Sequence, residues 1–192
     1  MALETKNSNR EYDMIVFMLE EPSMEALLSE LLPRIITDEE YRLISHEGKN
    51  DLIHSIPIKL KAWKMPGTRF VIVHDQDCHD CIDLKNRIEE VCEPYNREVL
   101  IRIVCRELES WYFGDIQAVE KAYGKDLSKI RCSNKYRIPD AIIDPKERIK
   151  RWIPELTQID GARRISKYMN IEDNTSHSFR VFVDGVKRMC EK

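Results

Sequence analysis

Several features are missing from the sequence, and each absence argues against a class of protein. No stretch approaches the roughly 20 consecutive apolar residues that a membrane span requires. There is no G-x-x-x-x-G-K-[ST] motif, which excludes a P-loop ATPase. There is no internal repeat and no low-complexity segment. Residues 1–10 are polar and mixed in charge, without the apolar core of a secretory signal. We therefore expect a cytoplasmic protein without membrane contact.

A second Cys-x-x-Cys pair is also missing. The six cysteines are irregularly spaced, which in a chain of this size favours reduced cytosolic thiols. Cys78 and Cys81 form a Cys-x-x-Cys pair beside His74 and His79. A zinc site commonly needs a second pair of Cys or His ligands, and a thioredoxin-like site needs a proline-bearing partner loop that cannot be placed. Zinc or redox chemistry at this pair is therefore only a minor alternative.

The composition fits one α/β core with a helical extension. The chain has 192 residues, of which 42% are hydrophobic and 34% charged. Residues 1–124 hold 15 Lys and Arg against 24 Asp and Glu, whereas residues 125–192 hold 16 against 10. We place the α/β core in 1–124 and a basic helical extension in 125–192. The acidic part suits a metal ion and the basic part suits phosphate; ordinary surface scatter is the alternative.

Residues 69–80 (RFVIVHDQDCHD) organise the rest of the chain. They open with an apolar, β-branched run typical of a strand buried on both faces of a parallel sheet. Carboxylates, imidazoles and a thiol then follow, at the end where such sheets place their functional crevices. Asp75 and Asp77 stand two apart, so both carboxylates can converge on a hard cation such as Mg²⁺. The alternative is that both are turn and cap residues before a helix at Ile82.

Strands and helices alternate at spacings that suit parallel βαβ units. We expect further strands over residues 11–19, 41–45 and 98–105. We expect helices over 24–32 (capped by Ser23), 51–63 (interrupted or restarted at Pro57) and 82–92, and one carrying Trp111 and Tyr112 as core residues. An irregular basic loop should fill 125–143, followed by helices that start at Asp144 and span 160–169 and 176–189.

Every expected strand ends in charged or imidazole-bearing residues. These are Glu20 and Glu21; His46 and Lys49; Asp75 and Asp77; and Arg106, Glu107 and Glu109. Carboxylates gathered at one edge repel one another unless a cation or a shared proton relieves them.

Two other α/β folds place acids at strand ends but do not fit this chain. A receiver domain places acids after strands one and three, but it needs a Lys after a fifth strand, and no such strand is expected here. A haloacid-type phosphatase carries its D-x-D after the first strand, whereas in this chain the D-x-D follows the third.

These motifs resemble the Toprim fold of topoisomerases, primases and OLD-type nucleases. Residues 19–25 (LEEPSME) are similar to the Toprim motif V-E-G-P-[ST]-[DE], and Asp75-Gln76-Asp77 is similar to its D-x-D. Glu21 stands where Gly is usual and Met24 where a second acid often stands, with Glu25 beside it. No topoisomerase tyrosine domain fits the remaining length. More closely, the chain resembles a short bacterial Toprim-like family of unknown function, through E-E-P-S-M-E-A-L-L, H-E-G-K-x-D-L, H-D-Q-D-x-x-D-C, C-R-E-L-E-S-W-Y-F-G-D and S-H-S-F-R-V-F.

The resemblance implies a Toprim-like (Rossmann-like), mostly parallel sheet flanked by helices, and a nuclease that uses Mg²⁺, with Mn²⁺ as an alternative. Glu20 would be general base or metal ligand, and Asp75 and Asp77 the metal-binding pair. Glu107 or Glu109 would hold a second ion, or simply lie favourably at a helix N-terminus. His46 is expected to be structural.

The resemblance also implies partners. Lys49 and Arg106 would contact phosphate, or else pair with the neighbouring acids. Arg163 and Arg164 would bind nucleic acid, either DNA or RNA, in the basic extension. An ABC-type or AAA-type ATPase is the expected protein partner, as in ATPase–nuclease pairs of phage defence. The alternative function is a non-catalytic Toprim-like module that docks or senses.

Overall fold

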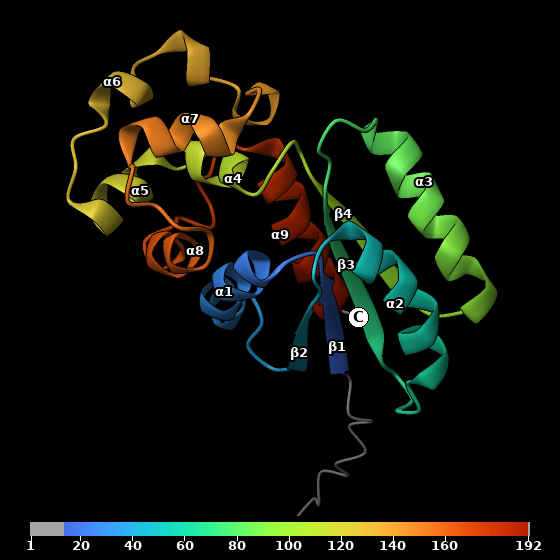
Figure 1. Ribbon diagram of the computed structural model, residues 1–192. Coiled ribbons are helices and arrows are strands. Elements are labelled where there is room, and N and C mark those ends of the chain that lie inside the picture. The colour runs from blue at the N-terminus through green and yellow to red at the C-terminus, as the bar shows by residue number, and fades with distance from the viewer. Residues whose placement is uncertain (1–13, 192) are drawn as a thin grey trace, which may run out of the picture.

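A four-stranded parallel sheet lies at the centre of the chain (Figure 1). A computed structural model describes residues 14–191. The strands are β1 (Met14–Leu19), β2 (Glu40–Ser45), β3 (Arg69–Asp75) and β4 (Val99–Val104). The main helices are α1 (Pro22–Leu31), α2 (Lys49–Ala62), α3 (Cys81–Cys92), α4 (Glu109–Phe113), α5 (Ile116–Tyr123), α6 (Ser128–Arg131), α7 (Pro145–Trp152), α8 (Gln158–Ser166) and α9 (His177–Cys190). The predicted parallel α/β sheet flanked by helices is confirmed, although residues 11–13 of the first expected strand lie outside the described part.

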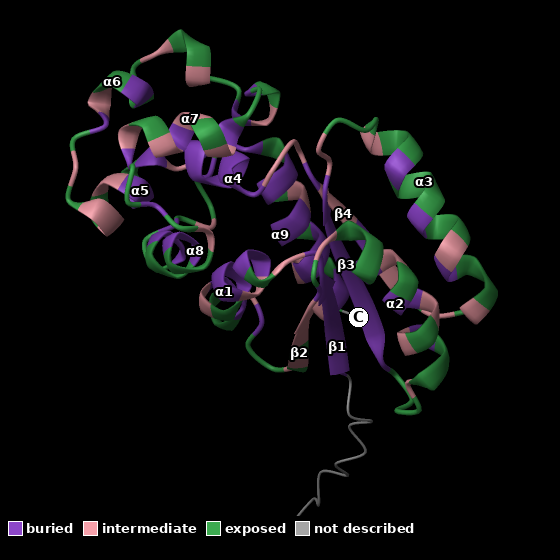
Figure 2. Ribbon diagram, viewed as in Figure 1, coloured by how far each residue is buried: buried purple, intermediate pink, exposed green. Residues whose placement is uncertain are grey.

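The two inner strands are buried on both faces, as their uninterrupted apolar runs predict (Figure 2). Successive side chains of a strand point to opposite faces. Met14, Val16 and Met18 therefore join the core under α2 and α3, together with Phe70 and Ile72. Their neighbours join the larger core under α1 and α9: Ile15, Phe17, Leu19, Val71 and Val73.

The strand order is β2-β1-β3-β4, so the chain reverses direction across the sheet at β1. The β1–β2 connection carries α1 on one face, whereas the later crossovers carry α2 and α3 on the other. Such a topological switch point opens a crevice beyond the carboxyl ends of the two strands that flank it. Here those strands are β1 and β3, which end at Glu20 and Asp75.

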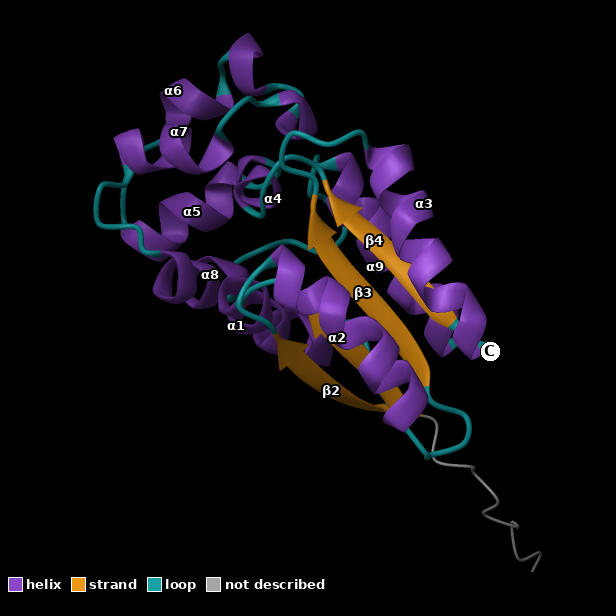
Figure 3. Ribbon diagram, turned by 45° about the vertical axis from the view of Figure 1, so that its right-hand side comes forward, coloured by secondary structure: helices purple, strands orange, loops and turns teal. Residues whose placement is uncertain are grey.

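Helices α4 to α8 form a lobe beyond the carboxyl ends of β3 and β4, toward which both arrowheads point in Figure 3. The lobe is not a separate core, because Ile153, Ile165 and Phe179 belong to the same buried cluster as Ile15 and Phe17. Trp111 and Tyr112 are each 1% exposed, which confirms them as core residues. The boundary at residue 124 stays a prediction. No described helix has the length and apolar character needed to cross a membrane.

Several helix starts differ from the predictions for local reasons. Glu21, not Ser23, is the N-cap of α1, because Pro22 suits the first helical position; Ser23 is buried and donates to the Glu21 carboxylate. Helix α2 starts at Lys49 and continues through Pro57, with Leu52, Ile56 and Leu60 buried on both sides of the proline. The packing of these three side chains outweighs the loss of the backbone hydrogen bond that Pro57 cannot donate.

The basic loop expected over 125–143 contains α6 and two 3₁₀ turns, Asn134–Tyr136 and Pro139–Ala141. Asp144 precedes α7 in a left-handed conformation (φ 52°), and its side chain accepts no capping hydrogen bond. Helix α8 begins two residues before its predicted start, at Gln158. The helix predicted over 176–189 is α9, and Ser176 is its N-cap, with its hydroxyl accepting from the amide of Phe179.

Candidate active site

Glu20 and His74 form the first part of the site, because the register of β1 and β3 places them side by side. Leu19 pairs with Val73, so the next residues, Glu20 and His74, are neighbours. Glu20 Oε2 lies 3.0 Å from His74 Nδ1 and accepts a 2.9 Å hydrogen bond from the backbone N–H of Asp75. The carboxylate of Glu20 is therefore held at the switch point by two donors from β3.

His74 is a functional candidate that the sequence analysis did not include. Its ring is buried, and Nδ1 also donates to the carbonyl oxygen of Asp75 at 2.5 Å. Burial lowers the pKa of His74, but the hydrogen bond and the charge of Glu20 raise it more, so the net shift is upward. The hydrogen bond from His74 holds the Glu20 carboxylate in one orientation. The sequence signal that could have identified His74 was the parallel alignment of the first and third strands, which makes the residues after Leu19 and Val73 neighbours.

Asp75 is the least compensated acid in the site. Its Oδ1 atom is buried and has no hydrogen-bond partner among the described residues. Burial raises the pKa of Asp75 well above its usual value, and the negative charges of Glu20, Glu21, Glu109 and Asp77 raise it further. A buried carboxylate with a bare oxygen, surrounded by other carboxylates, lacks the hydrogen bonds or cation that would normally accompany it.

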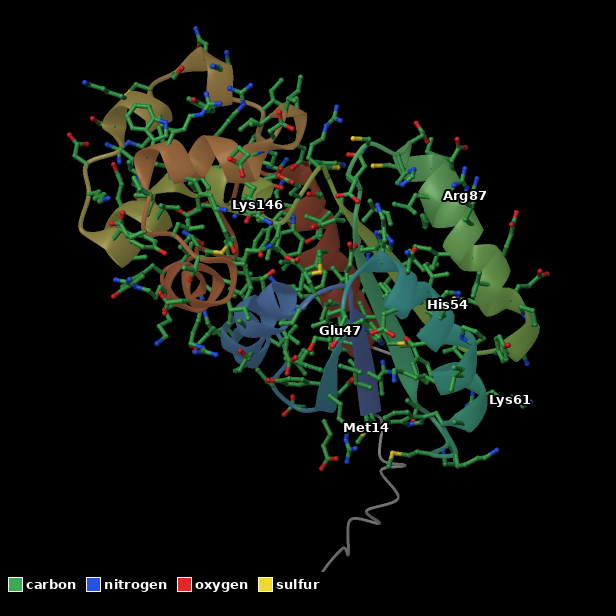
Figure 4. All side chains as sticks on the ribbon, viewed as in Figure 1. Met14, Glu47, His54, Lys61, Arg87 and Lys146 are labelled. Atoms are coloured by element: carbon green, nitrogen blue, oxygen red, sulfur yellow. The ribbon has the colours of Figure 1, made fainter. Side chains whose placement is uncertain are left out.

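Glu109, the first residue of α4, is 5% exposed. Burial raises its pKa to about 7, and the charges of Glu107 and Glu21 add to the shift, whereas its own backbone amide and Lys146 oppose it. Lys146 was not predicted as a site residue. It lies in the lobe beyond the sheet edge (Figure 4), and its backbone N–H donates to Glu107 at 3.1 Å. The lobe thus contributes an acid and a cation to the strand-end cluster.

Asp77 pairs with a lysine beside this cluster. Its backbone is left-handed (φ 52°) and its carboxylate accepts a 3.1 Å hydrogen bond from Lys49, so the ion-pair alternative for Lys49 is what the structure shows. Strand β3 ends at Asp75, so Asp77 lies beyond the period-two alternation, but its charge still raises the pKa of Asp75, and a joint metal site for the two stays a prediction. Neither residue caps α3; Asp80 does, by accepting from the amides of Ile82 and Asp83.

Among residues 14–191, no three His, Cys, Asp or Glu side chains are placed together as ligands of one metal ion. The donor chemistry nevertheless fits a hard cation, because Asp75, Glu109 and Glu21 are oxygen ligands that act on one another electrostatically and Asp75 Oδ1 is bare. Asp75 with Glu109 is therefore a second candidate pair for a cation, beside the predicted Asp75 and Asp77.

Comparison with known proteins adds a family and a fold. The family model described as "Domain of unknown function (DUF4276)" matches residues 19–187. The chain belongs to this family. No curated protein matches it. Solved structures similar to the DUF4276 chain include the C-terminal region of the Burkholderia pseudomallei OLD protein, with a TM-score of 0.56, 15% identity and coverage of 92% of this chain and 98% of that one.

A second similar structure is the C-terminal region of the Xanthomonas campestris pv. campestris OLD protein, with a TM-score of 0.52 and 11% identity. It covers 92% of the DUF4276 chain and 95% of its own. At these identities the likeness concerns the fold alone. The chain therefore shares the α/β fold of OLD C-terminal regions.

A cleft of about 340 Å³ opens beside the acid cluster of the DUF4276 chain. It is lined by Lys49, Asp77, Cys78, His79, Arg106, Glu107, Ile143, Asp144 and Pro145. Arg106 has a left-handed backbone (φ 64°) whose carbonyl accepts from Asp77 and whose amide donates to Gln76. The two predicted phosphate contacts, Lys49 and Arg106, therefore line the same cleft, together with Glu107.

The remaining predicted residues lie elsewhere or serve the fold. Glu25 accepts from the hydroxyl of Ser45. His46 is structural, with Nδ1 on the carbonyl of Leu19 at 2.8 Å and Nε2 on the hydroxyl of Ser55 at 2.6 Å. Arg163 is exposed on α8, and Arg164 lies 4.6 Å from the ring centroid of Tyr123.

The Cys-x-x-Cys pair does not act as a unit. The thiol of Cys81 is hydrogen-bonded to that of Cys105, whereas Cys78 is exposed, and both are free cysteines. Burial raises the pKa of the Cys105 thiol to about 12. Burial also raises the pKa of the Cys81 thiol. A thiol with a raised pKa is a poorer nucleophile at neutral pH, which weighs against a redox role for the pair.

Proposed function

We propose that this DUF4276 chain is a metal-dependent phosphodiesterase that cleaves nucleic acid at a Toprim-like site. The observation that supports it most is Asp75, a buried acid with a bare oxygen, set among four other carboxylates at the topological switch point. Burying so much negative charge without a counter-ion is costly. A cation bound during function gives a reason for the arrangement.

The residues have separate roles in this proposal. Asp75 and Glu109 would hold Mg²⁺ or Mn²⁺, and Glu21 lies close enough to raise the pKa of both. Such an ion, when bound, polarises a phosphodiester and stabilises the leaving oxygen. Glu20, which contacts His74 and the amide of Asp75, would accept a proton from the attacking water. Lys49 and Arg106 would contact substrate phosphates in the adjacent cleft.

The partner follows from the resemblance to OLD-type nucleases and not from any contact in the structure. An ABC-type or AAA-type ATPase encoded nearby would gate the site, as in a phage-defence system. The ion pair between Lys49 and Asp77 supports the second candidate, a docking module without catalysis, because it occupies two residues that a nuclease would use.

The test is a cleavage assay on plasmid DNA and on structured RNA with Mg²⁺ or Mn²⁺, with the protein alone and with its neighbouring ATPase. We expect cleavage that EDTA stops and that Glu20→Gln and His74→Ala both reduce. If the chain assembles with the ATPase and binds nucleic acid but no cleavage appears with either metal, the docking module is the better account.

Replacing Lys49 by Gln should separate substrate binding from stability. Its ion pair with Asp77 is solvent-exposed, with 48% of the Lys49 side chain accessible, so the free energy of unfolding should change by less than about 1 kcal/mol. The KM for nucleic acid should rise about tenfold with a smaller change in kcat, because a phosphate contact is made before and during reaction.

Lys85→Gln is the matched control for that measurement. Lys85 also forms an exposed pair, with Glu89 on α3, and 47% of its side chain is accessible. Its KM should stay at the wild-type value. Equal KM values for the two variants would remove Lys49 from the substrate contact.

A further inference from the structure

A second cavity, of about 410 Å³, lies in the lobe. We call it the lobe cavity. It is lined by Phe113, Gly114, Asp115, Ile116, Gln117, Ile130, Arg131, Tyr136, Arg137, Asn170, Asp173 and Thr175. Its volume falls in the range of small-molecule pockets. The strand-end site consists of the residues proposed for catalysis: Glu20, Glu21, His74, Asp75 and Glu109, with Lys49 and Arg106. None of them lines the lobe cavity, so the two sites are distinct.

The floor of the lobe cavity is apolar and aromatic. Phe113, Ile116 and Ile130 are buried. The rings of Phe113 and Tyr136 are stacked, with centroids 5.1 Å apart and planes 13° from parallel. Phe113 thus supports the half-buried ring of Tyr136, which can offer a face to a flat ligand, because nucleobases stack on aromatic side chains with little dependence on base identity.

The segment 125–137, of which Arg131 and Arg137 line the lobe cavity, is rich in positive charge. Residues 125–137 contain five Lys and Arg against one acid, Asp126. Lys125 pairs with Glu155 and Arg131 with Glu120, whereas Lys129, Lys135 and Arg137 have no acidic partner among the described residues. Figure 2 shows much of this segment, around α6 and the turn that follows, as exposed.

The acids of the lobe cavity are already hydrogen-bonded. Asp115 accepts from the amides of Ala118 and Asn170, at 3.1 and 2.7 Å. Asp173 accepts from the Asn170 side chain at 2.9 Å. These two acids match the charge of the lining residues Arg131 and Arg137, so the surplus positive charge comes from Lys129 and Lys135, which adjoin the lining residues Ile130 and Tyr136 in the chain and favour an anionic ligand.

Helix α4 connects the lobe cavity to the strand-end site. Glu109 begins this helix and Phe113 ends it, a rise of about 6 Å for four residues. The lobe cavity and the acid cluster therefore share a short helix.

We propose that the lobe cavity binds single-stranded nucleic acid, with an unstacked base against the Tyr136 ring and backbone phosphates on Lys129, Lys135 and Arg137. A duplex keeps its bases stacked inside the helix, whereas a single strand can insert one. The inference rests on the proposed function, since the bound strand would be the substrate of the strand-end site.

The test measures binding of a fluorescein-labelled 12-nucleotide deoxythymidine strand to the full-length chain in EDTA, by fluorescence anisotropy at increasing salt. Reversing Lys135 and Arg137 to Glu should weaken binding at least tenfold and make the salt dependence shallower by about 1.4, which is two phosphate contacts at ~0.7 each for single strands. Gln117→Trp should weaken binding about fivefold at unchanged charge, by filling the lobe cavity.

The matched control reverses Lys59 and Lys61 on α2, which lies on the opposite side of the sheet from α1 and α9, outside the lobe (Figures 1 and 4). It changes the net charge equally and should leave affinity within about twofold. Circular dichroism confirms folding of every variant. An equal loss in the control, tighter binding of a 12-base-pair duplex, or loss only on reversing Arg163 and Arg164 would each overturn the inference.

The outcome is independent of catalysis because no metal is present during binding. Loss of binding in the Lys135 and Arg137 variant supports the lobe cavity even if the wild-type protein cleaves nothing. Cleavage by the wild-type protein with unchanged binding in that variant would instead retain the proposed function and reject the lobe cavity.

Discussion

Replacing Asp75 by Asn is expected to abolish metal-dependent cleavage and, at the same time, to raise the melting temperature. Activity should fall by more than about 100-fold, since even indirect metal contacts are worth 10–100-fold. Stability should rise because burial and four neighbouring carboxylates raise the pKa of Asp75. Each 1 kcal/mol gained corresponds to roughly 2–4 °C for a chain of this size. Activity on a labelled oligonucleotide and differential scanning calorimetry provide the two readouts.

Asp80→Ala is the control for this double effect. Asp80 caps α3 and lies outside the acid cluster. Its loss should lower stability by ~0.5–2 kcal/mol and leave cleavage near the wild-type rate. If Asp75→Asn behaved like Asp80→Ala, losing stability while retaining activity, Asp75 would be a structural residue.

Replacing Glu109 by Gln should remove much of the loss of stability that we expect of the protein between pH 4.5 and pH 8. The folded state raises the pKa of Glu109 from 4.5 to about 7. The native state therefore binds this proton more tightly than the unfolded state, and stability falls as pH rises through that window. The effect of this one buried group is of order 3 kcal/mol. The Gln side chain stays neutral, so the variant should be the more stable protein at pH 8.

Urea denaturation of both proteins at pH 4 and pH 8 measures this difference. Glu89→Gln, at an exposed pair on α3, should retain the wild-type pH dependence. Adding Mg²⁺ should reduce the wild-type loss at pH 8, because a cation beside Glu109 stabilises its charged form. If Glu109→Gln and Glu89→Gln had the same pH profile, Glu109 would not hold the proton assigned to it.

The sheet was predictable because its inner strands have a simple physical signature. Continuous apolar runs such as Val71–Val73 need two buried faces, which a parallel sheet covered by helices supplies. The gathering of Glu20 and Asp75 at one edge followed from parallel strands. These conclusions depend on local residue types and on strand direction, and both can be predicted from a sequence.

The fine geometry was not predictable because it depends on backbone conformation and distant contacts. The left-handed turn at Asp77 sends its carboxylate to Lys49, 28 residues away in the chain. The pKa of Glu109 is raised because the fold buries its carboxyl group, and the periodicity of the sequence does not reveal that burial. The lobe cavity joins segments near residues 113, 130 and 170, a juxtaposition that only the fold creates.

The most direct test of the account is a titration of the metal-free protein with Mn²⁺, followed by isothermal calorimetry, for the wild-type chain and for Asp75→Asn. The account predicts a site in the wild-type protein whose affinity falls at least about 100-fold in the variant, because the bare carboxylate oxygen is the ligand that is lost. A wild-type protein that binds no Mn²⁺, or a variant that binds it with unchanged affinity, would contradict the account.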